Sequence, residues 1–411
     1  MSSFGYYSAR SVALLDYLER WVNDGSPSGF GVEGQMSSHT SPLGNEPYFN
    51  PLVVEDSTLL QRECLVSNIL PSPKLPFGFL IHPDMRGKWE SYGLNLSLRR
   101  DVVLIPTSSG RTARVSGSSN LGYVKFDYDA TLGRVNRSIN RTKGLASLEM
   151  SDELIRLLRS NSFSNIVILP EYAVELVRPK GHNGAYSGLL HRDGRFVGHP
   201  ESSATDTCAQ LIPLFSFWST DRKTGRDDIV LDRVFGGDPE KLALALEFSA
   251  TELLDFYFSA LLRAGLQLEY NAQNILVGVD NKSHPSCVCL RDFSSTEKDV
   301  TIRSSLGLST DFKSLPYKKL EAGTDEYKKR HSFAFDFKLS QYVAAPIAEL
   351  LNRFFGGRGD NLISSLRART SDWLMGSRDD LFPEGGVWYR HPKVDLTADR
   401  PYQKCRNPLL R

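Results

Sequence analysis

The sequence predicts an α+β protein in which a strand-rich region precedes a mainly helical one. Two observations support this prediction. Short β-branched and aromatic segments separated by Gly, Ser and Pro fill residues 71–215, whereas long segments with helical apolar spacing dominate residues 216–411. Residues 1–70 form a third, short helical region. Three regions are compatible with a chain of 411 residues.

The N-terminal region is expected to contain two helices. Apolar residues recur at helical spacing over 8–23 and are interrupted by charged residues, which indicates an amphipathic helix and not the apolar core of a signal peptide. A loop rich in Ser, Gly and Pro follows, and then a second short helix around 57–68. Within the loop, GFGVEG (29–34) matches the letters of a dinucleotide-binding motif but lacks the preceding strand, so we interpret it as a loop.

The middle region is expected to supply strands. Its β-branched and aromatic segments alternate in part between apolar and polar residues, which is typical of strands. The predicted strand segments are DVVLIP (101–106), LGYVKFDY (121–128), NIVILPEYAVELV (165–177) and SGLLHRDGRFVG (187–198).

The C-terminal region is expected to be helical, with one hairpin inside it. Asp238 and Pro239 are a favourable N-cap and first residue for a long helix that Gly265 ends. The strands of the hairpin are predicted at 274–280 and 287–293, on either side of a polar turn. Further helices are predicted at 338–355 and 361–375.

Composition excludes several classes of protein. With 49 basic and 48 acidic residues the net charge is +1, which does not favour a nucleic-acid-binding protein. No apolar run approaches the roughly 20 residues that cross a membrane, and five cysteines do not indicate a disulfide framework. Cys287 and Cys289 are interpreted as small buried residues because no second ligand pair follows them. We therefore expect a cytoplasmic protein without a structural metal, membrane segment or nucleic-acid partner.

A polar cluster surrounds the predicted hairpin. Glu269, Asn271, Gln273 and Asn274 precede its first strand, and Arg291 and Asp292 end its second. A hairpin returns its last residues to its first ones, so Asn274 and Asp292 can meet. Their oxygen atoms suit Mg²⁺, which proteins commonly hold through one or two carboxylates and substrate phosphates. A polar junction with a surface ion pair is an equally good interpretation of the pattern alone.

A basic cluster lies upstream, at 107–143, in a Ser- and Gly-rich setting with few acidic residues. Guanidinium groups, an ammonium and hydroxyls around a loop suit a triphosphate and a carboxylate. The alternative is a solvated basic strand edge. The residues of this cluster are Ser109, Arg111, Thr112, Arg114, Lys125, Arg134, Arg137 and Arg141.

Taken in order, these motifs resemble the NRPS-independent siderophore synthetases of the aerobactin synthetase (IucA/IucC) type. The order and approximate spacing of the motifs hold over residues 75–411. The matching elements are His82-Pro83, Ser109-Gly110-Arg111-Thr112, Lys125, Arg137, the stretch from Glu269 to Asn274, Arg291-Asp292 and Asn407-Pro408-Leu409.

The resemblance implies a cupped-hand fold, with β-rich fingers at 71–215, a helical palm at 216–411 and a reduced thumb at 1–70. It also implies an enzyme that uses ATP and Mg²⁺ to activate a carboxylic acid as an acyl-adenylate, which an amine or alcohol attacks to form an amide or ester. A homodimer is a further possibility that rests on the resemblance alone.

The resemblance also implies roles for individual residues. It assigns catalysis to Arg111, Lys125 and Arg137. It assigns ATP binding to Ser109, Arg111, Thr112, Lys125, Asn271, Gln273 and Asn274. His82 and Arg137 would hold the carboxylate substrate, and Glu269, Asn274 and Asp292 would hold the metal.

Two departures keep other functions open. Asn271 stands where the family has a histidine, and the N-terminal region is shorter and lacks the family's Gly-His-Pro-x-His-Pro segment. One alternative is a kinase-like phosphotransferase, because Asn274 is followed eighteen residues later by Asp292 and a phenylalanine. A second is an ATP-binding pseudoenzyme subunit. The tripeptide at 191–193, His-Arg-Asp, lacks the asparagine that follows it in kinases, so it is assigned no role.

Overall fold

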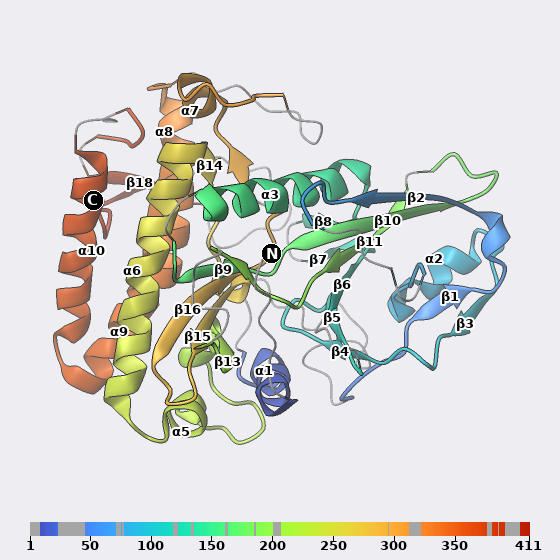
Figure 1. The fold of residues 1–411 in the computed structure, drawn as a ribbon, viewed down its shortest axis with the longest axis horizontal. Helices are drawn as coiled ribbons and strands as arrows, with labels where there is room; N and C mark the ends of the chain where they lie inside the picture. The colour runs from blue at the N-terminus through green and yellow to red at the C-terminus, as the bar shows by residue number, and fades with distance from the viewer. Residues whose placement is uncertain are drawn as a thin grey trace.

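The computed structural model describes most of the chain, and its strands and helices occupy different sides of the molecule. In Figure 1 the long helices of the C-terminal half stand on one side, and the strands of the N-terminal half extend away from them. The described residues are 9–23, 46–70, 75, 78–117, 122–132, 135–160, 163–184, 186–199, 207–294, 296–311, 322–375, 380–384, 386–390 and 403–411. The GFGVEG segment at 29–34 lies outside them.

The N-terminal region contains the first predicted helix but not the second. Helix α1 (Ala9–Trp21) confirms the amphipathic prediction. The predicted helix at 57–68 is wrong, because a single turn, η1 (Ser57–Leu59), leads directly into strand β2 (Leu60–Val66). Strand β2 pairs with β10 (Glu171–Pro179) at the edge of a sheet, and this pairing outweighs the helical appearance of the segment.

Six strands form an antiparallel sheet in the order β2-β10-β11-β6-β5-β4. The four strands not yet bounded are β11 (Ser187–Arg192), β6 (Tyr123–Phe126), β5 (Thr112–Val115) and β4 (Leu104–Pro106). With β10, which overlaps 165–177, they confirm strands in all four predicted segments. Shorter elements flank the sheet: β1 (Leu52–Val54), η2 (Pro83–Met85), α2 (Arg86–Glu90), β3 (Leu96–Leu98), β7 (Tyr128–Leu132) and β8 (Val135–Arg137).

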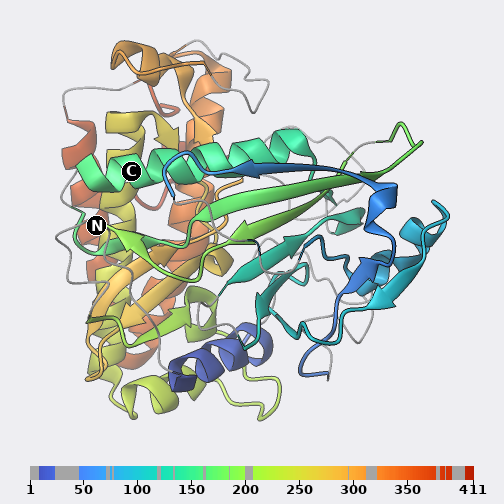
Figure 2. The same cartoon turned by 45° about the vertical axis from the view of Figure 1, so that its right-hand side comes forward.

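A long helix that was not predicted lies along this sheet. Helix α3 (Arg141–Ser160) crosses above β10 and β11 in both ribbon views (Figures 1 and 2). Its Gly144 lies so close to Val174 of β10 that a Cβ there would come within 2.9 Å of the valine side chain. Apolar residues such as Leu154 and Leu158 recur at helical spacing, but basic residues and a glycine at its start obscured that signal.

A second sheet joins the two halves of the chain. Its order is β12 (Val197–Gly198), β9 (Ile166–Ile168), β16 (Pro285–Leu290), β15 (Ile275–Val279) and β13 (Gln210–Pro213). Strands β15 and β16 are the predicted hairpin, which is confirmed. Cys287 and Cys289 are fully buried in it, as the sequence analysis inferred. Because the hairpin pairs with strands of the middle region, its two ends are held at a defined place relative to the six-stranded sheet.

The C-terminal helices follow the predicted caps. Asp238 accepts hydrogen bonds from two N–H groups at the start of α6 (Pro239–Ala264), and Gly265 ends the helix at φ 60°. The helix predicted at 338–355 begins earlier, at α8 (Asp325–Ser332), and continues through a π-helical segment, η5 (Phe333–Ala344), into α9 (Ala345–Phe355). The remaining elements are η3 (Leu214–Phe217), α5 (Ile229–Phe235), β14 (Leu266–Gln267), η4 (Ala272–Asn274), β17 (Glu297–Lys298), α7 (Val300–Ser305), α10 (Arg358–Leu374), β18 (Val387–Arg390) and β19 (Gln403–Arg406).

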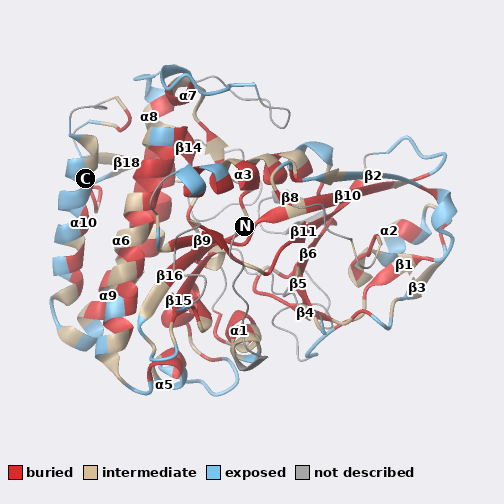
Figure 3. Cartoon of the chain, in the orientation of Figure 1, coloured by how far each residue is buried: buried red, intermediate tan, exposed pale blue. Residues whose placement is uncertain are grey.

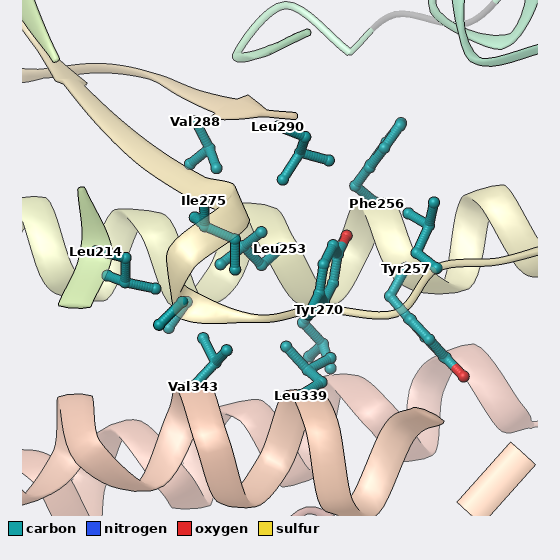
Figure 4. Packing of buried hydrophobic residues seen from close by; sticks show 14 of the residues in the cluster. Leu214, Leu253, Phe256, Tyr257, Tyr270, Ile275, Val288, Leu290, Leu339 and Val343 are labelled. Carbon is teal, nitrogen blue, oxygen red and sulfur yellow. The ribbon is translucent and has the colours of Figure 1, made fainter. Parts of the chain in front are cut away.

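The main apolar core surrounds α6. Leu253 and Tyr257 of this helix pack between the hairpin, represented by Ile275, and segment η5, represented by Leu339 (Figure 4). Buried residues are concentrated in α6 and in the inner strands of both sheets, whereas the edge strand β2 is largely exposed (Figure 3). This core packs against the hairpin and thereby fixes the position of the polar residues at its ends. Over the residues that the structure describes, no helix is long and apolar enough to cross a membrane.

Candidate functional site

Residues from the basic and the polar cluster meet where the six-stranded sheet faces the end of the hairpin. Lys125 Nζ of β6 donates to Asp292 Oδ1, just after β16, at 2.5 Å. The two side chains are 5% and 19% exposed, so this ion pair is largely removed from water. Two residues that are 167 positions apart in the sequence are thus joined in one buried contact.

Local structure explains both positions. Lys125 lies on a strand that is hydrogen-bonded on both sides, opposite Thr112 of β5 and Leu190 of β11. Asp292 adopts a left-handed backbone conformation, φ 63°, as the chain leaves β16. This conformation is uncommon for residues other than glycine and least unfavourable for Asn and Asp. It turns the chain at the point where the Asp292 carboxylate meets Lys125.

The charges around this pair strongly affect one another. Burial lowers the pKa of Lys125 to about 8, although Asp292 acts to raise it. Burial alone would raise the pKa of Asp292, but the charges of Lys125 and Arg192 hold it well below its usual range. The charge of Arg111 lowers both pKa values, which places this guanidinium within electrostatic reach of the pair.

Glu171 and Arg192 complete the cluster, and the sequence analysis missed both. Arg192 Nη2 donates to Glu171 Oε1 at 2.8 Å and lies 3.9 Å from Asp292 Oδ2. They face each other at the ends of β10 and β11, and Glu171 is fully buried. Arg192 belongs to the tripeptide that was assigned no role; the pairing of β10 with β11 places it opposite Glu171, and its guanidinium also lies near Asp292. We refer to Arg111, Lys125, Glu171, Arg192 and Asp292 together as the charged junction.

Two buried atoms of the charged junction are unsatisfied. Within the part of the chain that the structure describes, Glu171 Oε2 and Arg192 Nε have no hydrogen-bond partner. Unpaired buried polar atoms are costly, and in native proteins they often mark a place that a ligand or an ion completes. The only sequence signal for these residues was a charge at the end of each of two apolar strands.

The loop between β4 and β5 carries the other predicted phosphate ligands. Ser109 Oγ accepts a hydrogen bond from the Thr112 N–H at 3.1 Å, and Gly110 has φ 73°. The Arg111 carbonyl accepts from the Phe126 N–H at 2.8 Å, which ties the loop to β6 beside Lys125. We call residues 107–112 the serine loop.

The start of the hairpin faces the serine loop. Gln273 Nε2 donates to Ser108 Oγ at 3.3 Å, and the Asn271 side chain accepts from the Gln273 N–H at 3.1 Å. The Arg291 N–H donates to the Asn274 carbonyl at 3.0 Å, so Asn274 lies beside the residue that precedes Asp292. We call residues 271–274 with 291–292 the hairpin mouth.

The predicted metal ligands are only partly brought together. Glu269 Oε1 lies 2.9 Å from Lys338 Nζ and is therefore directed toward η5. In the described part of the chain, no group of three or more His, Cys, Asp or Glu side chains is arranged to hold a metal. A Mg²⁺ ion bound with a nucleotide needs fewer protein ligands, because phosphates supply the rest. Asp292 and Asn274 lie together in the hairpin mouth, whereas Glu269 is engaged by Lys338.

The two predicted carboxylate ligands differ in position. The His82 side chain is fully buried, with the rings of Phe49, Phe126 and Tyr128 centred 5.1–5.4 Å away. This burial lowers the pKa of His82 to about 4, so the ring is neutral near pH 7. Arg137 is the last residue of β8 and pairs through its backbone with Tyr128.

A separate hollow of about 720 Å³ lies between α6, α10 and the start of β9. Several of its polar side chains already contact one another: Arg369 pairs with Asp255, and Asn165 donates to Glu252. None of its lining residues belongs to the charged junction. Its size alone therefore does not make it the functional site.

The fold is that of the NRPS-independent siderophore synthetases, so the predicted α+β class and the resemblance are confirmed in three dimensions. Neither a protein-family model nor a curated protein matches the sequence.

Three solved structures illustrate this likeness. The petrobactin biosynthesis protein AsbB from Bacillus anthracis superposes with a TM-score of 0.62 at 12% identity, over 96% of this chain and 74% of that one. ATP-bound aerobactin synthetase IucA from Klebsiella pneumoniae gives 0.64 at 15% identity, over 92% and 72%. Aerobactin synthetase IucC from the same organism gives 0.58 at 14% identity, over 96% and 76%.

Proposed function

We propose that this protein is an ATP-dependent ligase of siderophore-type or related biosynthesis. It activates a carboxylic acid as an acyl-adenylate and transfers the acyl group to an amine or alcohol. The observation that supports this most strongly is the buried charged junction, where Lys125 of the fingers meets Asp292 of the hairpin. The fold adds support, because one structure that shares it is an ATP-bound synthetase.

The charge balance of the junction suits a polyanion. Its members are three cations (Arg111, Lys125, Arg192) and two carboxylates (Glu171, Asp292), so their formal sum is +1. Holding these charges away from water is costly, and replacing such clusters by apolar residues is often neutral or stabilising. A cluster of this kind is therefore better explained by binding of a charged ligand than by stability.

The proposed chemistry has two steps. A carboxylate oxygen of the acid attacks the α-phosphorus of ATP, the bond to the bridging oxygen breaks, and pyrophosphate leaves with the electron pair. The amine or alcohol then attacks the acyl carbonyl, loses its proton, and displaces AMP. Repulsion between two anions opposes the first step, and preorganised cations at Arg111 and Lys125 would lower that barrier.

The remaining predicted residues keep supporting roles in this proposal. Ser109, Thr112 and Gln273 would donate hydrogen bonds to the nucleotide from the serine loop and the hairpin mouth. Arg137 would bind the carboxylate of the acid. His82 is less suited to that role than Arg137, because its side chain is fully buried and neutral.

Mg²⁺ would be held by Asp292 and Asn274 together with phosphate oxygens. When bound, the ion shields phosphate charge. We predict that Asp292→Asn loses Mg²⁺-dependent ATP binding, which calorimetry with Mg²⁺ or with chelator measures without any turnover. Equal ATP affinities of wild type and variant in Mg²⁺ would contradict this role for Asp292.

Exchange of labelled pyrophosphate into ATP tests the proposed function. The purified protein is assayed with a panel of acids that includes citrate, succinate, 2-oxoglutarate and amino acids. Exchange that depends on one acid is expected, and Arg111→Ala should abolish it. Release of ADP in place of pyrophosphate would favour a kinase-like phosphotransferase. ATP binding without exchange for any acid or acceptor would favour a nucleotide-binding pseudoenzyme subunit.

A further inference from the structure

A carboxylate on the N-terminal helix contacts both halves of the proposed site. Glu19 of α1 is only 2% exposed. Its Oε1 lies 2.5 Å from Arg291 Nη2 in the hairpin mouth. Its Oε2 accepts a hydrogen bond from the Ser108 N–H of the serine loop at 2.9 Å. One side chain therefore joins two loops that are far apart in the sequence.

These contacts close a ring. Ser108 Oγ accepts a hydrogen bond from Gln273 Nε2 at 3.3 Å, and this bond joins the serine loop to the hairpin mouth. Arg291 Nε and Nη2 donate to the Gln273 carbonyl at 3.1 and 2.7 Å. Because the same guanidinium pairs with Glu19, these two hydrogen bonds close the ring. Each ring contact joins groups that are buried or partly buried.

The ring lies next to the residues proposed to bind the nucleotide but includes few of them. Ser108 precedes Ser109, and Arg291 precedes Asp292, so a displacement of either loop moves a proposed ligand. Gln273 is the one ring member to which nucleotide binding has been assigned. Glu19 contacts neither Lys125 nor Asp292 in any hydrogen bond or ion pair of the described residues. Its effect on them would have to pass through Ser108 and Arg291.

Helix α1 has other attachments that do not depend on Glu19. Asp16 receives two hydrogen bonds from Arg114 of β5, at 2.7 and 2.5 Å. Ser11 Oγ donates to the Ala209 carbonyl at 2.5 Å, beside β13. The helix lies between β13 and β4 (Figures 1 and 2). Substitution of Glu19 should therefore release the two loops and leave the helix docked.

We propose that Glu19 is a positioning residue that fixes the serine loop against the hairpin mouth, so that the two halves of the nucleotide site are held in register. This inference rests on the proposed function for its kinetic consequence, but its structural part stands apart from it. Misplacement of reacting groups by about 1 Å can reduce a rate by about 10²-fold. A neutral residue at 19 would leave the buried Arg291 guanidinium without its anion, and the ring would open.

Two readouts on the full chain test the proposal. In Glu19→Gln, deuterium uptake should rise in peptides covering 107–112 and 271–275, while α1 stays protected. The kcat for pyrophosphate exchange should fall by about 10- to 100-fold, with the KM for ATP within about threefold. Asp16→Asn, one helical turn earlier, is the matched control: it should raise uptake in α1 and leave kcat within about twofold.

The double variant Glu19→Gln with Arg291→Met separates positioning from simple loss of stability. It removes both partners of the ion pair, and it should be more stable than Glu19→Gln alone while its kcat stays low, because the serine loop is then no longer joined to the hairpin mouth through Glu19 and Arg291. Unchanged deuterium uptake in both loops of Glu19→Gln would overturn the proposal, as would loosened loops with an unchanged kcat. Absence of exchange in the wild type would instead refute the proposed function, and the deuterium uptake would still decide whether Glu19 fixes the loops.

Discussion

The core around α6 and the charged junction are both buried, but they differ in what burial costs. The core places apolar side chains such as Leu253 and Ile275 against one another, and each stabilises the fold by leaving water. The junction places Lys125, Asp292 and their neighbours where water is scarce, and ion pairs recover only part of the desolvation cost.

This difference separates residues that stabilise the fold from residues retained for another reason. Substitutions in the core should lower stability and leave the chemistry of the folded fraction intact. In the junction, removing one partner of an ion pair should remove activity and also lower stability, whereas replacing both partners by apolar residues should remove activity with little loss of stability or even a gain. The four predictions that follow test this contrast, from the largest expected effect to the smallest.

The largest effect is expected for Lys125→Met. Loss of the ammonium should reduce acid-dependent pyrophosphate exchange by at least about 10²–10³-fold, because a preorganised cation is lost from the proposed reacting centre. Lys282→Met, in the exposed turn between β15 and β16, is the control and should keep full activity. Activity of Lys125→Met close to that of the control would remove the junction from the active site.

Breaking the other ion pair should be costly only when one partner remains. Arg192→Met leaves Glu171 buried without its cation, and we expect the free energy of unfolding to fall by about 3–5 kcal/mol. Replacing both residues, as Glu171→Leu with Arg192→Met, should recover most of that loss. Urea unfolding measures both variants, and equal losses would contradict the view that the uncompensated charge is the cost.

A substitution in the core should lower stability and leave the activity of the folded protein unchanged. Leu253→Ala should lower the free energy of unfolding by about 3 kcal/mol through lost burial and the cavity left behind. Leu244→Ala, on an exposed part of the same helix, should change it by less than about 0.5 kcal/mol. At a temperature where both variants are folded, their exchange activities should match the wild type. A loss of kcat in folded Leu253→Ala would contradict the proposed distinction between residues that stabilise the fold and residues that serve the chemistry.

The smallest effect is the loss of stability that His82 is expected to cause at acidic pH. Its pKa is about 4 in the folded protein and about 6.5 in an unfolded chain, so below pH 6.5 only the unfolded chain takes up the proton. Stability is therefore lost as the pH falls from 6.5 toward 4, by about 1 kcal/mol at pH 5.5.

His82→Asn tests this directly, because asparagine can still accept the hydrogen bond from the Asp84 N–H. Between pH 7 and 5.5 the variant should lose about 1 kcal/mol less than the wild type in urea unfolding. The exposed His284, changed to Asn, is the control. A pH dependence identical to that of the wild type in His82→Asn would show that this ring is not held neutral by burial.

Local signals predicted much of the fold. The caps at Asp238 and Gly265 marked both ends of α6, and the turn after Val279 marked the hairpin, because these features depend on neighbouring residues alone. The segment at 57–68 was misassigned because its strand character comes from pairing with β10, more than 100 residues away. Helix α3 was missed because glycine and basic residues weaken its first turns.

The site was predictable in its parts but not in its assembly. Lys125 and Asp292 were each singled out, yet nothing in the sequence indicated that they pair with each other. Glu19, Glu171 and Arg192 escaped notice because a buried charge on an apolar strand or helix looks like an ordinary surface charge until its neighbours are known. Their roles arise from contacts between distant segments, which spacing along the chain does not reveal.

A crystal structure with bound Mg²⁺ and a non-hydrolysable ATP analogue tests the central claim most directly. We predict that the triphosphate lies within hydrogen-bond distance of Arg111 and Lys125, between the serine loop and the hairpin mouth, with Asp292 bound to the metal. A nucleotide bound elsewhere, for example in the hollow beside Asp255, with the Lys125–Asp292 pair intact, would contradict the account.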